Sequence, residues 1–405
     1  MKILMFSQYY FPEKFLIHEI AERLVEQGHE VTVVTGLPNY GFPGGRIPDE
    51  YLRDDKSDEQ INGVRVLRCR IMGRGTSKLR LLGNYFTYML RANGVAKKPE
   101  KDYDVVFCYQ LTPVLQLYPA IRYCREHEKK LLCYCLDLAP ESGIRLLKRF
   151  PVSSMLYTKF SQWAYQHCDN IAVTSQSFID YLADVNGVER SRLFYLPQHA
   201  PDNLLTQDLS KPHGETADFL FAGNLGTGGA LSTIVYAAEV LVKSGVTSFR
   251  VHLVGEGSVK NELIALTHAL QLEDYVLFHD GVPASKMPEI YQKADALLIT
   301  LRKGQMTIPG KLQAYMAAGK PILGAMGGSG KELIGESECG RCVEAEDHTG
   351  LASLMMAYIE NPQTFDVPAA NGRRYFRENF TADIFIDKLT QLLDKTKEGV
   401  QNEHS

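Results

Sequence analysis

The chain has 405 residues, of which 45% are hydrophobic and 23% charged, and its formal net charge at pH 7 is −4. This length exceeds what one hydrophobic core ordinarily holds, so we expect a globular protein with two domains of roughly 200 residues each. The negative charge argues against a general nucleic-acid binder, which needs a basic face. No apolar run approaches the roughly 18 residues of a membrane span, and no signal peptide is visible, which predicts a cytoplasmic protein.

The first half alternates short apolar strands with helical stretches. Residues 2–6 form a buried strand, residues 17–25 carry apolar side chains at helical spacing, and residues 31–35 form a second strand. This order predicts a parallel, doubly wound sheet that takes ligands at the carboxyl ends of its strands. Further strands are expected at residues 64–69, 104–109, 130–136, 170–174 and 193–196.

The second half repeats this pattern after a polar stretch, residues 206–218, which we interpret as the linker. The sequence therefore predicts an α/β protein with Rossmann-like domains at residues 1–204 and 205–374. The remaining segment, residues 375–405, is expected to form a helix over 375–393 that packs back toward the first domain, followed by a polar tail. Strands of the second domain are expected at residues 219–223, 249–254, 276–278, 296–299, 321–325 and 341–343.

Three strand ends of the second domain carry glycines that let the backbone approach a ligand. They are Gly223-Asn-Leu-Gly226, Val254-Gly-Glu-Gly257 and Pro309-Gly-Lys311. Each alone also fits an ordinary turn of a doubly wound domain. Together, with helix N-termini that bind anions, they predict a nucleotide-diphosphate site. The residues expected to bind the nucleotide are Gly223, Asn224, Gly255, Gly257, Val282, Arg302, Pro309, Gly310 and Lys311.

Metal binding is not expected from this sequence. The close cysteine pairs, Cys133 with Cys135 and Cys339 with Cys342, lack the second half of a metal-binding motif, so we expect reduced thiols. No acidic metal-binding cluster is visible either. Lys311, with Arg302 as a second candidate, is instead expected to neutralise a leaving diphosphate.

A basic and apolar segment lies in the first half. Residues 61–99 contain nine Lys or Arg residues and no acidic residue, and aromatic and aliphatic side chains alternate with them. This composition favours contact with an anionic membrane surface, and it also fits a solvated helix whose apolar face is core. The residues expected to contact an acceptor or a membrane are Arg74, Lys78, Arg80 and Tyr85.

These motifs resemble the family 4 retaining glycosyltransferases, which have the GT-B fold. In the second half the resemblance lies in Ala222-Gly-Asn-Leu-Gly226, Val254-Gly-Glu-Gly257 and Pro309-Gly-Lys-Leu-Gln-Ala-Tyr315. In the first half it lies in Tyr9-Tyr-Phe-Pro-Glu13 and Asp137-Leu-Ala-Pro-Glu-Ser142, which are similar to the bacterial capsule, exopolysaccharide and O-antigen branch. The resemblance implies two Rossmann-like domains that face a cleft.

Two positions depart from the family pattern. The family's pair of Glu residues, of which the second contacts the donor ribose, falls here on Met306 and Ala314. Neither side chain accepts a hydrogen bond, so Gln313 or Tyr315 is the candidate for the ribose contact. The family's Gly-Gly pair near the donor phosphates is replaced by Glu13-Lys-Phe-Leu16, in which Lys14 is a candidate for the missing positive contact.

The resemblance also implies a reaction. A sugar is expected to pass from a nucleoside-diphosphate sugar, UDP-linked in our interpretation, to a lipid-linked or growing cell-surface saccharide, with no protein base and no cofactor. Lys311 is the expected stabiliser of the leaving diphosphate, and Asp137 and Glu141 are candidates to orient the acceptor. For Asp137, capping of the following helix is the alternative role.

Two other functions stay open at this point. One is a GT-B epimerase of UDP-sugars, and the other is a sugar-nucleotide-binding scaffold without turnover. We expect the enzyme on the inner face of the cell membrane, as a peripheral protein that binds no nucleic acid. A dehydrogenase is not expected, because the first strand-to-helix turn lacks the glycine-rich dinucleotide fingerprint.

Overall fold

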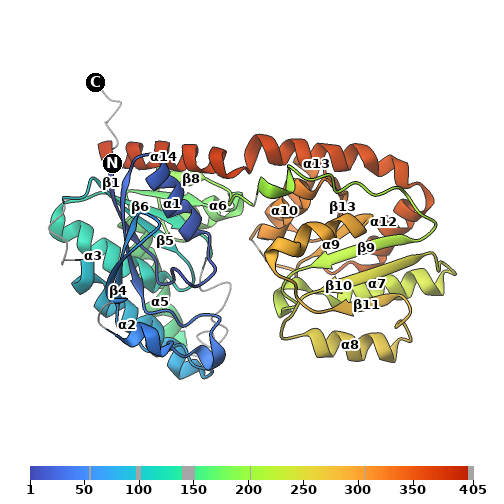
Figure 1. Ribbon diagram of the computed structural model, residues 1–405, viewed down its shortest axis with the longest axis horizontal. Helices are drawn as coiled ribbons and strands as arrows, with labels where there is room; N and C mark the ends of the chain where they lie inside the picture. The colour runs from blue at the N-terminus through green and yellow to red at the C-terminus, as the bar shows by residue number, and fades with distance from the viewer. Residues whose placement is uncertain (54–55, 97–101, 139–150, 201, 306, 400–405) are drawn as a thin grey trace. The chain divides into compact units, whose positions relative to one another are not determined.

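The computed structural model describes residues 1–53, 56–96, 102–138, 151–200, 202–305 and 307–399. The chain divides into two compact units (Figure 1). The N-terminal unit comprises Met1–Pro197 and Ile386–Ser405, and the second unit comprises Gln198–Phe385. The division at residues 204 and 374 stays a prediction about functional domains.

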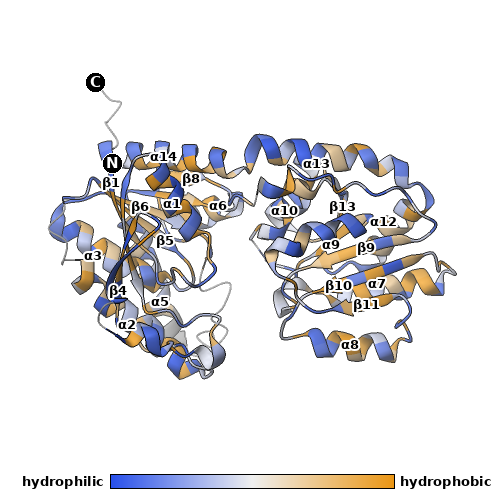
Figure 2. Cartoon of the chain, viewed as in Figure 1, coloured by the Kyte–Doolittle hydropathy of each residue, from blue (hydrophilic) through white to orange (hydrophobic). Residues whose placement is uncertain are grey.

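The N-terminal unit is built on an eight-stranded sheet in the order β3-β4-β2-β1-β5-β6-β7-β8. Neighbouring strands are parallel except β3, which pairs antiparallel with β4. Every strand expected in this half is present, and Figure 2 shows these strands as largely apolar. The strands are β1 (Lys2–Phe6), β2 (Glu30–Gly36), β3 (Asp58–Ile61), β4 (Val64–Cys69), β5 (Val105–Gln110), β6 (Leu131–Cys135), β7 (Asn170–Val173) and β8 (Leu193–Tyr195).

The helices of this unit cover the sheet with their apolar faces. Helix α1 buries Ile17, Ile20, Ala21 and Leu24, which recur at helical spacing. Helix α2 packs on β2 and β4 and against α3. The helices are α1 (Ile17–Glu26), α2 (Lys78–Ala96), α3 (Leu117–His127), α5 (Pro151–Gln166) and α6 (Gln176–Asp184), with 3₁₀ turns at Pro43–Gly45, Asp49–Leu52, Val114–Gln116 and Arg190–Arg192.

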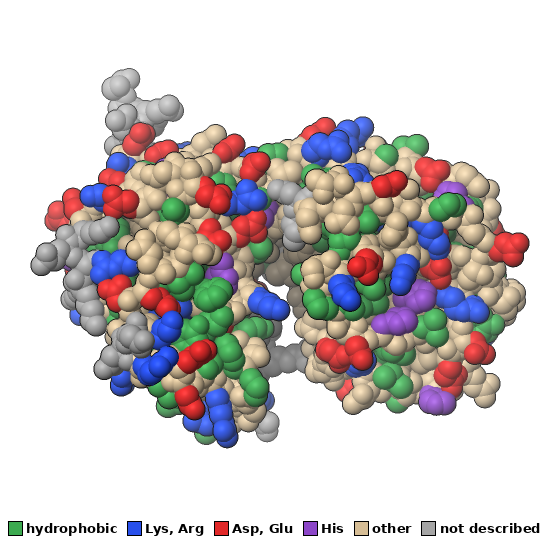
Figure 3. Space-filling model, viewed as in Figure 1, with side chains coloured by type: hydrophobic (Ala, Val, Ile, Leu, Met, Phe, Trp, Pro, Cys, Tyr) green, Lys and Arg blue, Asp and Glu red, His purple; other side chains and the backbone are tan. Residues whose placement is uncertain are grey.

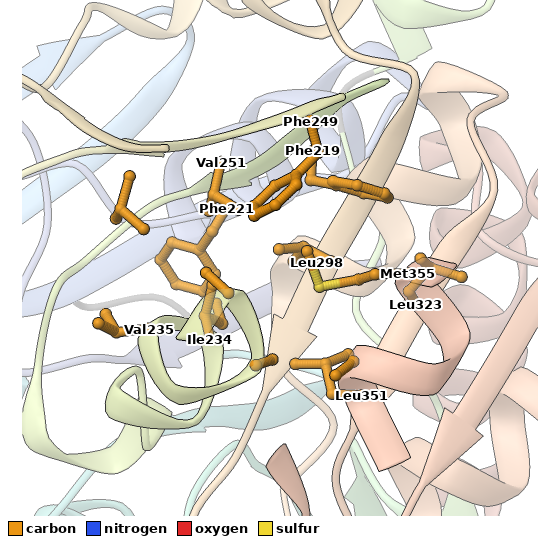
Figure 4. Packing of buried hydrophobic residues seen from close by; sticks show 14 of the residues in the cluster. Phe219, Phe221, Ile234, Val235, Phe249, Val251, Leu298, Leu323, Leu351 and Met355 are labelled. Carbon is orange, nitrogen blue, oxygen red and sulfur yellow. The ribbon is translucent and has the colours of Figure 1, made fainter. Parts of the chain in front are cut away.

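The second unit contains a six-stranded, fully parallel sheet in the order β11-β10-β9-β12-β13-β14. Successive residues of β9 point to opposite faces, as a strand requires. Phe219 and Phe221 join the core against α7 and α12, which Figure 4 shows, whereas Leu220 and Ala222 join the core on the other face. The strands are β9 (Ala217–Ala222), β10 (Phe249–Val254), β11 (Val276–His279), β12 (Ala296–Thr300), β13 (Ile322–Ala325) and β14 (Gly340–Val343).

Helices cover both faces of this sheet. They are α7 (Ser232–Lys243), α8 (Lys260–Ala269), α9 (Met287–Lys293), α10 (Gly310–Ala318), α11 (Gly328–Ser337), α12 (His348–Glu360) and α13 (Asp366–Asn379). Short 3₁₀ turns occur at Asp202–Leu204, Thr227–Gly229, Ala284–Lys286 and Pro362–Phe365.

The prediction of a single C-terminal helix over residues 375–393 is wrong in its limits. The structure has α13 and then α14 (Ala382–Glu398), separated at Phe380 and Thr381. The Thr381 hydroxyl accepts a bond from the Ile384 N–H at 3.4 Å, as a helix-capping side chain does, so a new helix begins there. In the N-terminal unit, Asn170 Nδ2 donates to Thr396 Oγ1 of α14 at 2.9 Å.

The eight cysteines are free thiols, as expected, and all but Cys342 are buried. In the part of the chain that the structure describes, no helix combines the length and the apolar character that a membrane span requires.

Candidate functional site

The loops that follow β9 and β10 are locked together through glycines. Gly223 has φ +143° and Gly255 has φ +148°, which L side chains rarely adopt. A Cβ atom on Gly255 would lie 1.9 Å from the Gly223 carbonyl oxygen, and one on Gly257 would lie 2.2 Å from the Leu225 oxygen. The Leu225 N–H donates to the Glu256 oxygen at 2.8 Å. The backbones of the two loops therefore lie side by side at the carboxyl ends of adjacent strands.

Lys311 reaches this place from the first turn of α10. Its Nζ lies 3.7 Å from the centre of the Phe221 ring and 3.0 Å from where a Cβ on Gly223 would be. Burial lowers the pKa of Lys311 to about 8, because the ammonium has lost water. The residue that precedes α10, Pro309, makes no side-chain cap, and its oxygen accepts from the Leu312 N–H at 2.9 Å, so the N–H groups of Gly310 and Lys311 are the ones placed to face a ligand. A partly buried cation beside the N–H groups of a helix N-terminus is suited to a diphosphate.

Tyr315 fixes α10 against the loop after β9. Its hydroxyl accepts a bond from the Ala222 N–H at 2.9 Å and donates to the Ala222 oxygen at 3.3 Å. The residue is fully buried. These bonds hold Lys311 next to Gly223, so Tyr315 positions the site, and its hydroxyl is already used by the protein rather than open to a ribose.

Gln313 likewise serves its own helix. Its side chain is 2% exposed. In the amide orientation that satisfies both groups, its nitrogen donates to the carbonyl oxygens of Pro309 and Gly310, each at 3.1 Å. The prediction that Gln313 contacts the donor is therefore not supported by its position. Ala314 is partly buried against the core, and Met306 lies outside the described residues.

The start of α11 is a part of the site that the sequence interpretation missed. Strand β13 is followed by Met326-Gly-Gly-Ser-Gly330, and α11 begins at Gly328, whose φ is +60°. A Cβ on Gly330 would lie 3.9 Å from Pro309 Cδ, so this turn adjoins the start of α10. The glycines that follow β13, Gly327, Gly328 and Gly330, were the available signal. Two helix N-termini thus meet at this edge of the sheet.

Val282 and Arg302 lie in separate cavities. Val282 lines a largely apolar cavity of about 530 Å³ beside β10, β11 and α9, with Gly281, Val254 and Ile290. Arg302 is exposed and lines another cavity, of about 260 Å³, with Ser232, Tyr236 and Glu346. Lys311 lines neither of them, so the prediction that Arg302 shares the diphosphate contact with Lys311 gains no support.

Asp137 follows β6 in the N-terminal unit. It accepts a hydrogen bond from the Thr112 hydroxyl, which follows β5, and its backbone oxygen accepts from Gln110 Nε2 at 3.2 Å. The carboxylate thus lies where adjacent parallel strands end, which is the usual ligand edge of such a sheet. Glu141 lies outside the described residues.

Glu13 joins two loops at the same edge of this sheet. Its carboxylate accepts bonds from the N–H groups of Asn39 at 2.7 Å, Tyr40 at 2.6 Å and Tyr10 at 3.2 Å. Burial raises the pKa of Glu13 to about 7, although these bonds oppose the shift. Lys14 beside it is exposed.

Helix α2 presents a second apolar face to the solvent. Its core face is formed by Asn84, Tyr88, Ala92, Asn93 and Ala96. Four large side chains on the other side are exposed, among them Leu79 at 81% and Leu90 at 65%. We call Leu79, Leu82, Phe86 and Leu90 the α2 stripe. Lys78, Arg80 and Arg91 are exposed on the same helix, and Figure 3 shows apolar and basic side chains together in this region.

Metal ligands are not grouped in the described ranges. No three His, Cys, Asp or Glu side chains among those residues lie close enough together to hold an ion.

Two family models match the chain, one in each unit. The glycosyl transferase 4-like domain matches residues 16–199, and the model of glycosyl transferases group 1 matches residues 207–379. The chain belongs to the family 4 glycosyltransferases of GT-B fold. In this glycosyltransferase, the Lys311 site lies within the group 1 segment, and Asp137 and α2 lie within the 4-like domain.

A curated relative and several solved structures are similar to this glycosyltransferase. The putative colanic acid biosynthesis glycosyl transferase WcaI of Escherichia coli is 24% identical over 349 residues, which is 79% of this chain and 82% of WcaI. Sucrose-phosphate synthase from Thermosynechococcus elongatus superimposes with a TM-score of 0.73 at 15% identity, covering 96% of this chain and 98% of the other. Anabaena HepE, solved with UDP, gives 0.71 at 15% identity, covering 97% and 100%.

Proposed function

We propose that this glycosyltransferase moves a sugar, with retention of configuration, from a UDP-sugar to a lipid-linked or growing cell-surface saccharide. The observation that carries the proposal is the partly buried Lys311 ammonium beside Gly223 and two helix N-termini. That arrangement suits the diphosphate of a nucleotide sugar. HepE, which shares the fold, has been solved with UDP and with UDP-glucose. The relationship to WcaI, a putative colanic acid biosynthesis glycosyl transferase, supports a role in the synthesis of a cell-surface saccharide.

In the proposed mechanism, the leaving diphosphate is stabilised by Lys311 and the backbone N–H groups around it. A donor phosphate oxygen takes the proton of the acceptor hydroxyl on the face from which UDP leaves, so the reaction needs no protein base. Asp137 orients the acceptor, with Glu141 as the second candidate. Because Lys311 supplies the positive charge, we propose that the reaction needs no metal, and EDTA should leave the rate unchanged.

The proposal is tested by UDP release from a panel of UDP-sugars, with and without lipid-linked saccharide acceptors. Acceptor-dependent UDP release supports a transferase. Conversion of a UDP-sugar without any acceptor would support an epimerase instead, and UDP binding without any turnover would support a scaffold.

The affinity for UDP should depend on pH through Lys311. Its pKa of about 8 in the free protein must rise when a diphosphate binds, because the bound anion stabilises the ammonium. UDP affinity is therefore expected to be full below about pH 8 and to fall, by up to about tenfold per pH unit, as the pH rises beyond it. Calorimetric titrations between pH 7 and 9 measure this, and Lys311→Met should remove most of the slope. An unchanged slope in that variant would contradict the assignment.

We further propose that α2 attaches the enzyme to the inner face of the cell membrane. The α2 stripe supplies apolar contact, and exposed Lys78 and Arg80 supply charge, each worth about 1 kcal/mol at an anionic surface. The double variant Lys78→Gln/Arg80→Gln is expected to bind phosphatidylglycerol vesicles about tenfold or more weakly in sedimentation assays. Its affinity for UDP should not change. Undiminished vesicle binding would rule out this mode of attachment.

A further inference from the structure

Arg74 is a half-buried cation without an anionic partner among the described residues. Its Nη1 donates to the Tyr9 hydroxyl at 3.0 Å, and its guanidinium lies 5.1 Å from the centre of the Tyr40 ring. The Tyr85 hydroxyl also interacts with it. These partners are neutral, so the guanidinium keeps its full charge and several unused N–H donors. Aromatic side chains around a cation hold it in place without neutralising its charge.

The segments around Arg74 are held together by buried hydrogen bonds. Asn84 on α2 donates from Nδ2 to the Met72 oxygen at 2.6 Å and accepts at Oδ1 from Gln8 Nε2 at 2.7 Å. It is fully buried. The three N–H bonds to Glu13 join the loops that carry Tyr9 and Tyr40. The Arg74 segment, α2 and both loops are therefore one rigid assembly, and its open donors are held in place before any ligand arrives.

Arg74 meets α2 through Tyr85, near the middle of the length that the α2 stripe spans. Met72, two residues before Arg74, is 43% exposed, and its Sδ would lie 2.6 Å from a Cβ on Gly83. The Met72 N–H donates to the Thr87 hydroxyl at 2.9 Å. Met72 thus lies on α2 at Gly83 and Thr87, which are the sequence neighbours of Leu82 and Phe86 in the stripe. From Leu79 to Leu90 the stripe runs about 16.5 Å at 1.5 Å per residue, so it can contact part of a hydrocarbon chain.

We propose that Arg74 binds a phosphate group of the lipid-linked acceptor and that the hydrocarbon chain of this lipid lies along the α2 stripe. A guanidinium matches two phosphate oxygens with parallel N–H bonds. The unpaired charge beside α2 and the apolar surface on the same helix are complementary to an amphiphile with an anionic head. This inference rests on the proposed function, in which the acceptor is lipid-linked, and it names the residue that recognises the acceptor's head group.

The test uses farnesyl diphosphate as a probe of the full-length enzyme, with inorganic diphosphate and farnesol as the separate halves of that molecule. Calorimetry should show that farnesyl diphosphate binds more tightly than either half. Arg74→Gln should weaken its binding about 10- to 100-fold, which is the effect of losing a hydrogen bond to a charged group. Arg190→Gln, which removes an exposed charge paired with Asp180 and Asp184, is the matched control and should have no effect.

Further variants keep the test decisive if Arg74→Gln unfolds. Arg74→Lys keeps the charge but loses the paired donors, and Tyr85→Phe keeps the ring but frees the guanidinium; both should weaken binding of the probe several-fold. Thermal unfolding of each variant checks the fold. Wild-type affinity for farnesyl diphosphate in the folded Arg74 variants would overturn the proposal.

Two more measurements distinguish an acceptor lipid from membrane head groups as the ligand of Arg74. Binding of Arg74→Gln to phosphatidylglycerol vesicles should match the wild type. An equal loss of vesicle and probe binding would assign Arg74 to membrane head groups and overturn the acceptor assignment. If wild-type enzyme releases UDP with a lipid-linked acceptor but does not bind the probe, this inference fails while the proposed function stands. If it binds the probe but never releases UDP, the proposed function fails.

Discussion

Lys311→Ala is expected to lower the turnover number about a hundredfold, which is the typical effect of losing one donor that stabilises a transition state. The ammonium lies over the Phe221 ring beside the Gly223 backbone, where charge would build up on a leaving diphosphate. Burial already costs this cation part of its hydration, so removing it should not harm the fold. Steady-state rates of UDP release, compared with the melting temperature of the same sample, separate loss of catalysis from unfolding.

The matched control is Lys243→Ala. Lys243 lies at the end of α7, is 72% exposed in its side chain and pairs with Glu239. Its removal should change neither the rate nor the stability measurably, since exposed ion pairs contribute little. A Lys311→Ala enzyme as fast as the Lys243→Ala enzyme would show that the diphosphate is held elsewhere.

The second large effect is expected for Gly255→Ala. The new methyl group would lie 1.9 Å from the Gly223 oxygen, and the φ angle of +148° disfavours any side chain. The loops after β9 and β10 must then separate, which moves the backbone that faces Lys311. We expect at least a hundredfold loss of UDP affinity in calorimetry and a free energy of unfolding lowered by roughly 1–3 kcal/mol.

Gly335→Ala provides the contrast for that substitution. Gly335 lies in α11, and a Cβ there meets no atom within 4 Å. Alanine in a helix is favoured over glycine by about 0.5–1 kcal/mol, so this variant should bind UDP normally and melt slightly higher. Equal UDP affinities for the two variants would mean that the packed glycine loops are not part of the donor site.

Much of the fold could be predicted because parallel strands leave a strong signal. Strands such as Val64–Cys69 and Phe249–Val254 are short stretches rich in apolar residues, interrupted only by Arg or His, and both were predicted with the observed limits. Strand β3 was missed because Asp58-Glu-Gln-Ile61 has no apolar alternation. The break between α13 and α14 was missed because Thr381 serves as a cap inside a sequence that otherwise has helical spacing.

Only those features of the candidate site that follow from strand order could be predicted from the sequence. The closeness of Gly223, Gly255 and Lys311 follows from strand order, since each lies where a parallel strand ends or where the next helix begins. The use of the Gln313 amide by its own first turn depends on a side-chain rotamer that no pattern encodes. The same holds for helix α2, because residue spacing alone does not show which of its apolar residues lie in the core and which face the solvent.

The N-terminal unit is built from two separate segments of the chain, and this affects the order of folding during synthesis. The unit needs residues from both ends of the sequence, since buried Asn170 bonds Thr396 and Asp104 pairs with Lys397. Residues 198–385, in contrast, form one continuous segment. On the ribosome, the part made first is therefore complete only once α14 has been made, while the part made second already has all of its own strands and helices.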